Sequence, residues 1–237
     1  MHVQLLRPLR PLVTLPRLVA DIVFPPACLA CNAPLESARH FTCPRCREAM
    51  GDVDEWDERY RSALESLCAG GALAGLVAAW YFEEGGPVQA LVHALKYEGM
   101  TGLGGEFGRA LGERIRDSGY GGADAVVPLP LHRSRRRERG FNQSECIARG
   151  VSSVTGIPVA GNLVRRSRFT RSQTPLSPGE RSENLRGAFR GSGRSAGATL
   201  LLVDDVVTTG ATMRECARAL RSAGARAVIA CAAALAR

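Results

Sequence analysis

Two acids followed by a threonine-rich turn are the residues of this sequence whose types and spacing could do chemistry. Asp204 and Asp205 come directly after the apolar run of residues 198–203, and the turn that follows contains Thr208, Thr209, Gly210, Ala211 and Thr212. Hydroxyls and backbone N–H groups in such a turn bind phosphate, and glycine lets the backbone approach the anion closely. Carboxylates suit sugar hydroxyls or a hydrated magnesium ion instead. The order predicts a cradle for a sugar phosphate.

The elements around this segment would position it. An apolar run without polar alternation predicts a strand covered on both faces, as in a parallel sheet, and such sheets bind ligands at the carboxyl ends of their strands. A helix over residues 212–223, before Gly224, would add its positive N-terminal end. The alternative is an ordinary strand, turn and helix in which the acids and threonines only cap the helix.

Two other phosphate-binding motifs are excluded. The loop of nucleotide hydrolases requires Gly-Lys-Ser/Thr, but the single lysine, Lys96, stands in Leu-Lys-Tyr. The glycines at 102, 104, 105 and 108 lack the dinucleotide-binding spacing and follow no predicted strand.

Four cysteines near the N-terminus have the spacing of metal ligands. Cys28 and Cys31 form one Cys-x-x-Cys pair, and Cys43 and Cys46 form a second pair eleven residues later. Two such pairs typically hold one structural zinc ion in a tetrahedral site, which leaves no open coordination position. A disulfide pair or a redox motif is the weaker alternative, because no secretory signal precedes the cysteines.

Apolar patterns after residue 75 alternate between strands and helices. We expect strands over residues 76–82, 125–127, 200–203 and 227–233, and helices that include residues 88–95, 103–115, 147–154 and 212–223. This alternation predicts an α/β fold with a mostly parallel sheet. Residues 161–197 are rich in arginine, glycine and serine and weakly periodic, which predicts a mobile flap.

Positive charge is concentrated in two arginine clusters. The formal net charge is +8, and residues 132–139 contain five arginines. Arg165, Arg166, Arg168 and Arg171 form the second cluster. This density predicts binding to pyrophosphate or to a nucleic-acid backbone, and a solvated arginine-rich face is the alternative.

The N-terminal segment is not a typical signal sequence. Arginines and prolines interrupt the apolar run of residues 1–24, which either forms a short helix or remains a frayed tail. No other stretch has the roughly 18 uncharged apolar residues that a membrane span requires. We therefore expect a cytoplasmic protein.

The acid-threonine segment closely resembles the phosphoribosyl pyrophosphate (PRPP) signature of the type I phosphoribosyltransferases. The resemblance implies that Asp204 and Asp205 hold the ribose 2′ and 3′ hydroxyls and are the catalytic residues. It implies that Thr208, Thr209, Gly210, Ala211 and Thr212 hold the 5′-phosphate, with Mg²⁺ on the pyrophosphate. The loop after residues 125–127 would contact the pyrophosphate, and its candidate residues are Leu131, His132, Arg133, Ser134 and Arg139.

A longer set of motifs resembles the ComF family, in which a phosphoribosyltransferase-like domain follows a zinc ribbon. The motifs are the segments at residues 90–99, 126–132, 139–143, 173–176 and 180–189, followed by the PRPP segment. The resemblance implies an N-terminal segment over residues 1–24, a zinc ribbon over 25–50, a linker over 51–75 and a phosphoribosyltransferase-like domain over 76–237. Many members carry further cysteine pairs, of which only Cys68 remains here.

Two functions follow from this resemblance. The first is a PRPP- and Mg²⁺-binding protein that transfers phosphoribosyl to an unidentified acceptor and acts in natural competence, with competence proteins as partners. The second is a non-catalytic module that binds single-stranded DNA through its zinc ribbon and arginine loops, with PRPP as a regulator. Aromatic residues make up only 5% of the chain, which weighs against the second function because single-strand binders stack bases on exposed rings.

Overall fold

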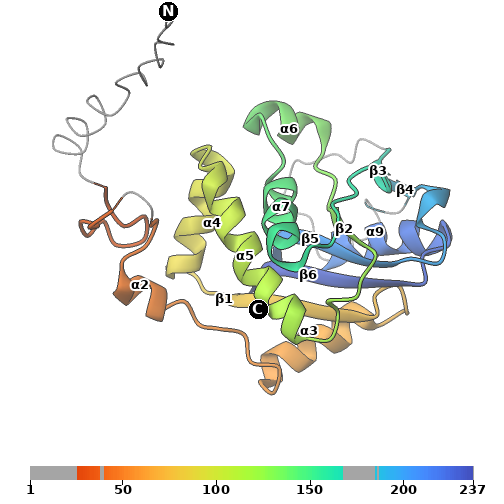
Figure 1. Cartoon of the computed structure of the whole chain (residues 1–237), viewed down its shortest axis with the longest axis horizontal. Helices are drawn as coiled ribbons and strands as arrows, with labels where there is room; N and C mark the ends of the chain where they lie inside the picture. Colours follow the sequence, from red (N-terminus) through yellow and green to blue (C-terminus); the bar gives the residue numbers. More distant parts are fainter. Residues whose placement is uncertain (1–25, 38–39, 168–184, 186, 237) are drawn as a thin grey trace, which may run out of the picture.

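The computed structural model describes residues 26–37, 40–167, 185 and 187–236. These residues form a parallel sheet of four strands in the order β1-β6-β5-β2 (Figure 1). The strands are β1 (Gly75–Phe82), β2 (Ala125–Pro128), β5 (Thr199–Val207) and β6 (Ala227–Ala236). Their side chains are almost all buried, as their apolar sequences require. The predicted α/β fold with a parallel, covered sheet is therefore confirmed.

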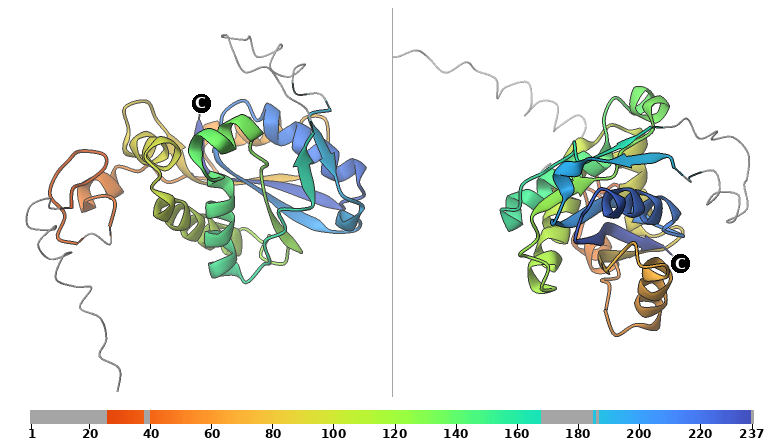
Figure 2. Two further views of the ribbon diagram at one scale, coloured as in Figure 1. Left: turned by 90° about the horizontal axis from the view of Figure 1, so that it is seen from above. Right: turned by 90° about the vertical axis from the view of Figure 1, so that its right-hand side faces the viewer.

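Helices cover both faces of the sheet, and each face has its own apolar core (Figure 2). One face is covered by α4 (Pro87–Tyr97), α5 (Thr101–Asp117) and α7 (Gln143–Thr155), and the other by α3 (Glu58–Cys68) and α9 (Ala211–Ser222). The loops at the carboxyl ends of the strands therefore lie between two helical layers, where parallel α/β proteins bind their ligands.

The segment over residues 51–75, which we expected to be a linker, packs into the core. Val53, Tyr60 and Leu67 are buried on the same face of the sheet as α9. Val53 also donates a backbone hydrogen bond to the carbonyl of Ala79 in β1. The spacing of these apolar residues gives α3 a buried side, so the segment is a structured part of the α/β domain.

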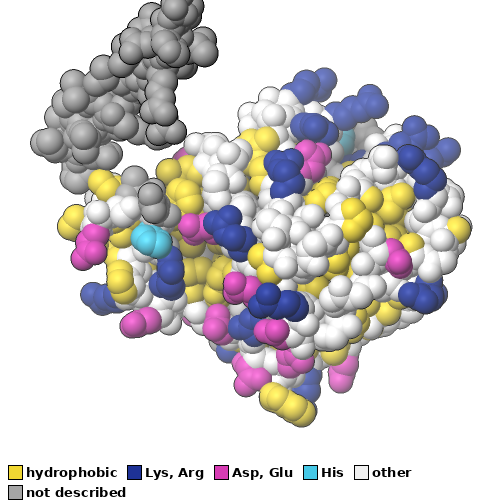
Figure 3. Space-filling view, viewed as in Figure 1, with side chains coloured by type: hydrophobic (Ala, Val, Ile, Leu, Met, Phe, Trp, Pro, Cys, Tyr) yellow, Lys and Arg dark blue, Asp and Glu magenta, His cyan; other side chains and the backbone are white. Residues whose placement is uncertain are grey.

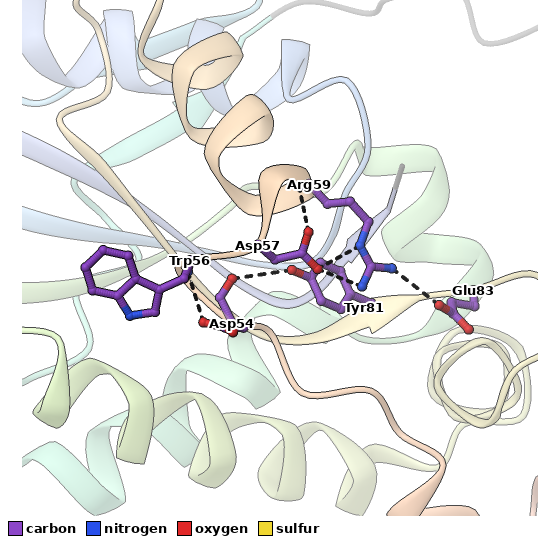
Figure 4. Close-up of polar contacts among 6 residues, drawn as sticks. All are labelled: Asp54, Trp56, Asp57, Arg59, Tyr81 and Glu83. Atoms are coloured by element: carbon purple, nitrogen blue, oxygen red, sulfur yellow. Dashed lines mark hydrogen bonds and ion pairs between the residues drawn. The ribbon is translucent and has the colours of Figure 1, made fainter.

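A polar network fixes the start of α3 to the end of β1. The Arg59 guanidinium lies 3.8 Å from the centre of the Tyr81 ring and pairs with Asp57 at 2.8 Å and with Glu83 at 3.5 Å (Figure 4). Hydrogen bonds from Arg59 lower the pKa of Asp57 to about 2, and Asp57 also caps α3 by accepting the Arg59 backbone N–H. The network therefore sets the position of α3 relative to the sheet.

The region that we predicted to be a mobile flap begins and ends in a small antiparallel sheet. β3 (Val164–Arg166) pairs with β4 (Phe189–Gly191), and a short 3-10 helix, η1 (Gly193–Ser195), follows. Val164 and Phe189 are buried in the same core as α9, which attaches this sheet to the domain. Residues 168–184 and 186, including Arg168, Arg171 and most of the motifs at 173–176 and 180–189, lie outside the described residues.

Residues 26–37 and 40–50, which include the four cysteines, form a lobe beside α4 and α5 (Figure 1). Cys28 begins a tight turn in which Asn32 has a left-handed backbone (φ 60°), and Cys43 precedes the short helix α2 (Pro44–Glu48). Leu29 and Phe41 of this lobe pack against the core beneath α4 and α5. The predicted segment over residues 1–24 lies outside the described residues.

Candidate functional site

The acid pair lies at the carboxyl end of β5, between the two helical layers. We expected the strand to end at residue 203, but it continues through the acids to Val207 because β6 pairs with it at Asp204↔Ala232 and Val206↔Ala234. The acids line a cavity of about 590 Å³, the acid cavity. Its other lining residues are Phe82, Gln89, Val92, His93, Lys96, Tyr97, Leu129, Pro130, Leu131, Arg135, Arg139, Gln143, Ser144, Arg166, Val206, Thr208 and Thr212.

An ion pair from α4, a hydrogen bond from α7 and backbone N–H groups of the strand itself hold the acids. The Lys96 Nζ lies 2.6 Å from Asp205 Oδ2, and Asp205 is only 3% exposed. Ser144 Oγ donates to Asp204 Oδ1 at 2.9 Å. The backbone N–H groups of Asp205 and Val206 donate to Asp204 Oδ1 and to Asp205 Oδ1, both at 2.9 Å. The carboxylates are therefore fixed before any ligand arrives.

Burial makes this acid pair unusual in its protonation. Burial and then the neighbouring Asp205 raise the pKa of Asp204 to about 7, although Lys96 and Ser144 act in the opposite direction. A buried carboxyl beside a second one is harder to ionise, and pKa shifts of this size are typical of functional sites. The pair can therefore hold or release a proton near neutral pH.

The threonine-rich turn closes one side of the acid cavity. Thr208 and Thr212 line it, and α9 begins at Ala211 with its N-terminus towards this turn. Gly210 has a left-handed backbone (φ 67°), and a Cβ atom there would clash with Leu67 Cδ2 of α3. The turn therefore needs glycine both for its backbone conformation and for its contact with α3.

The predicted pyrophosphate loop after β2 is divided between two cavities. Leu131 and Arg139 line the acid cavity, whereas His132 and Arg133 line a neighbouring one. Residues that we expected to form a loop belong to a short helix, α6 (Arg133–Arg139), which His132 caps by accepting the Ser134 backbone N–H. Arg139 donates to Gln143 and lies 5.1 Å from the Tyr97 ring centre.

The neighbouring cavity, of about 870 Å³, is lined mainly by arginines and is called the arginine cavity here. Its lining residues are His132, Arg133, Arg137, Arg165, Arg166, Ser167, Gly187, Phe189 and Arg190. Arg133, Arg137, Arg165 and Arg190 pair with no carboxylate in the described part of the chain. Burial and the surrounding arginines lower the pKa of His132. Figure 3 shows basic side chains gathered over α6 and the β3–β4 pair.

Sequence reasoning missed Lys96 and Ser144 as site residues. Lys96 belongs to a motif that we quoted for the family resemblance, but nothing in that motif indicates that α4 ends beside the acids. Ser144 lies two residues after Asn142, the residue that caps α7 by accepting the Ser144 backbone N–H at 3.2 Å. Each of these residues lies at a helix end that only the tertiary fold brings to β5.

The four cysteines form one cluster with the geometry of a metal site. Their Sγ atoms all lie within 4.8 Å of one another, with Cys31 and Cys43 3.7 Å apart. A tetrahedral zinc ion with Zn–S bonds of about 2.3 Å needs sulfur atoms roughly 3.8 Å apart. Burial raises the pKa of Cys28, but hydrogen bonds from the backbone N–H groups of Cys43 and Cys31 outweigh it and lower the pKa to about 6. The cluster could hold a metal ion such as zinc.

Comparisons with known proteins agree with this geometry. Residues 142–237 match the family model of the phosphoribosyl transferase domain. The chain is 25% identical to Competence protein F of Haemophilus influenzae over 214 residues, which span 83% of this chain and 91% of that protein. It is 34% identical to DNA utilization protein YhgH of Salmonella typhi over 146 residues, 60% of this chain and 64% of that protein.

Solved structures are similar to this chain only distantly. Glutamine PRPP amidotransferase from B. subtilis matches 54% of this chain and 26% of its own chain, with 23% identity and a TM-score of 0.37. Among the described residues, every helix is too short or too polar to cross a membrane. The phosphoribosyl transferase domain match over residues 142–237, the similarity to Competence protein F along most of both chains and the four-cysteine lobe before the α/β domain together support a ComF family protein.

Proposed function

We propose that the acid cavity binds PRPP or a related phosphoribosyl ligand. The observation that carries this proposal is the meeting of three elements at one cavity: the acids of β5, the threonine turn before α9 and the loop after β2. The acids suit ribose hydroxyls, and the turn and the loop suit two separate phosphate groups. PRPP contains a ribose, a 5′-phosphate and a pyrophosphate, so it needs all three elements. The matched phosphoribosyl transferase domain supports the same ligand class.

Each part of the ligand has a partner in the cavity. Asp204 and Asp205 would accept hydrogen bonds from the ribose hydroxyls, and the turn with Thr208 and Thr212 would hold the 5′-phosphate at the positive end of α9. Arg135 and Arg139 would face the pyrophosphate, because guanidinium groups bind phosphate oxygens through paired hydrogen bonds.

Magnesium fits this site only as an ion shared with the ligand. Lys96 already neutralises Asp205 Oδ2, and the two Oδ1 atoms accept backbone hydrogen bonds, so the acids do not form an ion cage by themselves. Mg²⁺ is commonly bound through one or two carboxylates together with substrate phosphates. Bound in that way, it would neutralise the pyrophosphate, while the acids orient the ribose.

The proposed reaction, if the chain is an enzyme, is transfer of the phosphoribosyl group to an acceptor. The C1–O bond to pyrophosphate breaks with its electron pair leaving on pyrophosphate, and a nucleophile forms the new bond to C1. This chain would contribute positioning and charge stabilisation. The names of the relatives, Competence protein F and DNA utilization protein, support a role in natural competence.

A binding measurement with a matched pair of variants tests this proposal. Asp205→Asn removes one buried carboxylate of the cavity, whereas Asp117→Asn removes a carboxylate that is 78% exposed at the end of α5. Equilibrium dialysis with PRPP and Mg²⁺ should show binding by the native protein and by Asp117→Asn but not by Asp205→Asn. Equal binding by all three proteins would exclude the acid cavity as the site.

The arginine cavity supports a second candidate function, the binding of single-stranded DNA. Four of its arginines have no carboxylate partner among the described residues, so they can neutralise phosphates. The logarithm of the DNA-binding constant should fall linearly with the logarithm of the salt concentration. The double variant Arg133→Ala/Arg165→Ala should make the magnitude of this slope smaller by about 0.7 for each lost phosphate contact. The exposed Arg116→Ala is the control, and an equal salt dependence of both variants would reject this role.

A further inference from the structure

Lys96 stands apart from every other basic residue of the chain. It is the single lysine among 31 lysines and arginines, and it lies in the last turn of α4. Its side chain is only 22% exposed, and its Nζ lies 2.6 Å from Asp205 Oδ2. We propose that Lys96 is a positioning residue of the phosphoribosyl site, which holds the Asp205 carboxylate in its binding orientation. This inference rests on the proposed function.

The contacts of the two acids assign them different tasks. Asp205 is held at both oxygens, by the Val206 backbone N–H at Oδ1 and by Lys96 at Oδ2. Asp204 is held only at Oδ1, by Ser144 and by the Asp205 backbone N–H. Its Oδ2 accepts no hydrogen bond from the described residues, so it is the oxygen left for a ligand. Lys96 thereby fixes one acid and leaves the other available.

Lys96 itself is held by the fold. The residues before it in α4, Ala94 and Leu95, are buried, and so are Leu91 and Val92 one turn earlier. These contacts fix the rotation of the helix and direct position 96 to the acid cavity. The ammonium also lies near the negative C-terminal end of α4, which favours a cation. The position of the charge is therefore set by the packing of the apolar side chains of α4 around it.

A compact ammonium suits this place better than a guanidinium. An arginine pairs best with a carboxylate when it donates to both oxygens at once, but Asp205 Oδ1 already accepts the Val206 N–H. Lysine donates to a single oxygen as a point charge. This difference gives a physical reason for a lysine at position 96 in a chain that otherwise uses arginine in place of lysine.

Lys96 could act on the ligand in one other way, by contacting the pyrophosphate directly. The two roles differ in their response to the ligand. A residue that acts through Asp205 affects the ribose end, so it matters equally for PRPP and for ribose 5-phosphate, which lacks the pyrophosphate. A residue that contacts pyrophosphate matters for PRPP alone. Ribose 5-phosphate therefore separates the two roles.

The experiment compares the native protein with K96M, K96R and the control R116M by calorimetric titration. Arg116 is 62% exposed on α5, so R116M makes the same change of charge outside the cavity. We expect K96M to weaken both ligands by about 10- to 100-fold, as loss of a group that orients a binding residue typically does. K96R, which keeps the charge but not the geometry, should recover part of this loss, and R116M should bind like the native protein.

Thermal unfolding and metal content of each variant show that it is folded. A folded K96M that binds both ligands like the native protein would overturn the proposal, and so would a loss confined to PRPP. If the native protein bound neither ligand, the proposed function would fail and this inference with it. Normal binding by the native protein and by K96M would overturn the inference alone.

Discussion

At the scale of single residues, the site keeps a charged group where the fold would be more stable without one. Asp204 is buried beside Asp205, and its pKa of about 7 lies well above the ordinary value of 3.8. The folded protein therefore binds a proton more tightly than the unfolded chain does. The contribution of Asp204 to the free energy of unfolding is fully present below about pH 4, where the carboxyl is protonated in both states. It is lost as the pH rises through the folded-state pKa of about 7. The binding site is thus built at a cost in stability.

Asp204→Asn should therefore stabilise the protein while it removes ligand binding. Asparagine cannot ionise, so the variant escapes a penalty of at most roughly 4 kcal/mol, since each pKa unit corresponds to about 1.4 kcal/mol. The gain in unfolding free energy should be larger at pH 8 than at pH 5, as measured by denaturant unfolding. Asp117→Asn serves as the control. A gain that is absent at pH 8, or larger at pH 5, would contradict the burial argument.

At the scale of elements, α3 packs against the threonine-rich turn between β5 and α9. Leu67 of α3 packs against Gly210, and the Arg214 guanidinium of α9 donates to the Ser66 carbonyl at 3.2 Å. The Arg59 network fixes the other end of α3 to β1 (Figure 4). The turn between β5 and α9 therefore depends on residues from a segment that precedes the sheet.

Gly210→Ala tests this dependence. The new Cβ would clash with Leu67 and require a left-handed backbone, so we expect a loss of stability of roughly 1–3 kcal/mol and weaker binding of ribose 5-phosphate. Gly193→Ala is the control, because a Cβ at Gly193 meets nothing within 4 Å. Adding Leu67→Ala to Gly210→Ala should recover part of the ligand affinity. A Gly210→Ala protein as stable as the control would show that α3 does not constrain the turn.

The sequence predicted the central elements closely and the peripheral ones poorly, for physical reasons. Apolar periodicity predicted all four strands of the sheet within a few residues, because buried strands must be apolar. It did not predict that β5 continues to Val207, since this depends on pairing with β6, which is remote in sequence. It also missed α3, whose two buried residues, Tyr60 and Leu67, are too few for a clear apolar pattern.

The candidate site was predicted in part for the same reason. Asp204, Asp205, Thr208 and Thr212 lie close together in sequence, so a local pattern was enough to find them. Lys96 and Ser144 reach the acids from α4 and α7, and only the packing of those helices on the sheet reveals this. The roles of all these residues stay predictions until binding is measured.

At the scale of the whole molecule, the acid cavity, the arginine cavity and the four-cysteine cluster are three distinct candidate sites. The acid cavity and the arginine cavity adjoin, and Arg166 lines both. The four-cysteine lobe contacts the α/β domain through Leu29 and Phe41. An anionic chain in the arginine cavity would therefore lie beside the acid cavity, whereas the four-cysteine lobe is attached to the layer of α4 and α5. The lobe should therefore be separable from ligand binding.

Cys43→Ser tests that separation. We expect the variant to lose its bound zinc, and residues 25–50 to become sensitive to protease, because a four-cysteine lobe of this size relies on metal for its folding energy. Cys68→Ser, which changes a cysteine outside the cluster, should keep the metal. PRPP binding should survive in both variants. An unchanged zinc content in Cys43→Ser, measured by elemental analysis, would reject the metal site.

The most direct test of the central claim is a calorimetric titration of the native protein with PRPP, with and without Mg²⁺. The double variant Asp204→Asn/Asp205→Asn is measured beside it under the same conditions. The acid cavity predicts Mg²⁺-dependent binding by the native protein and none by the double variant. Failure of the folded, zinc-loaded native protein to bind PRPP would contradict the account.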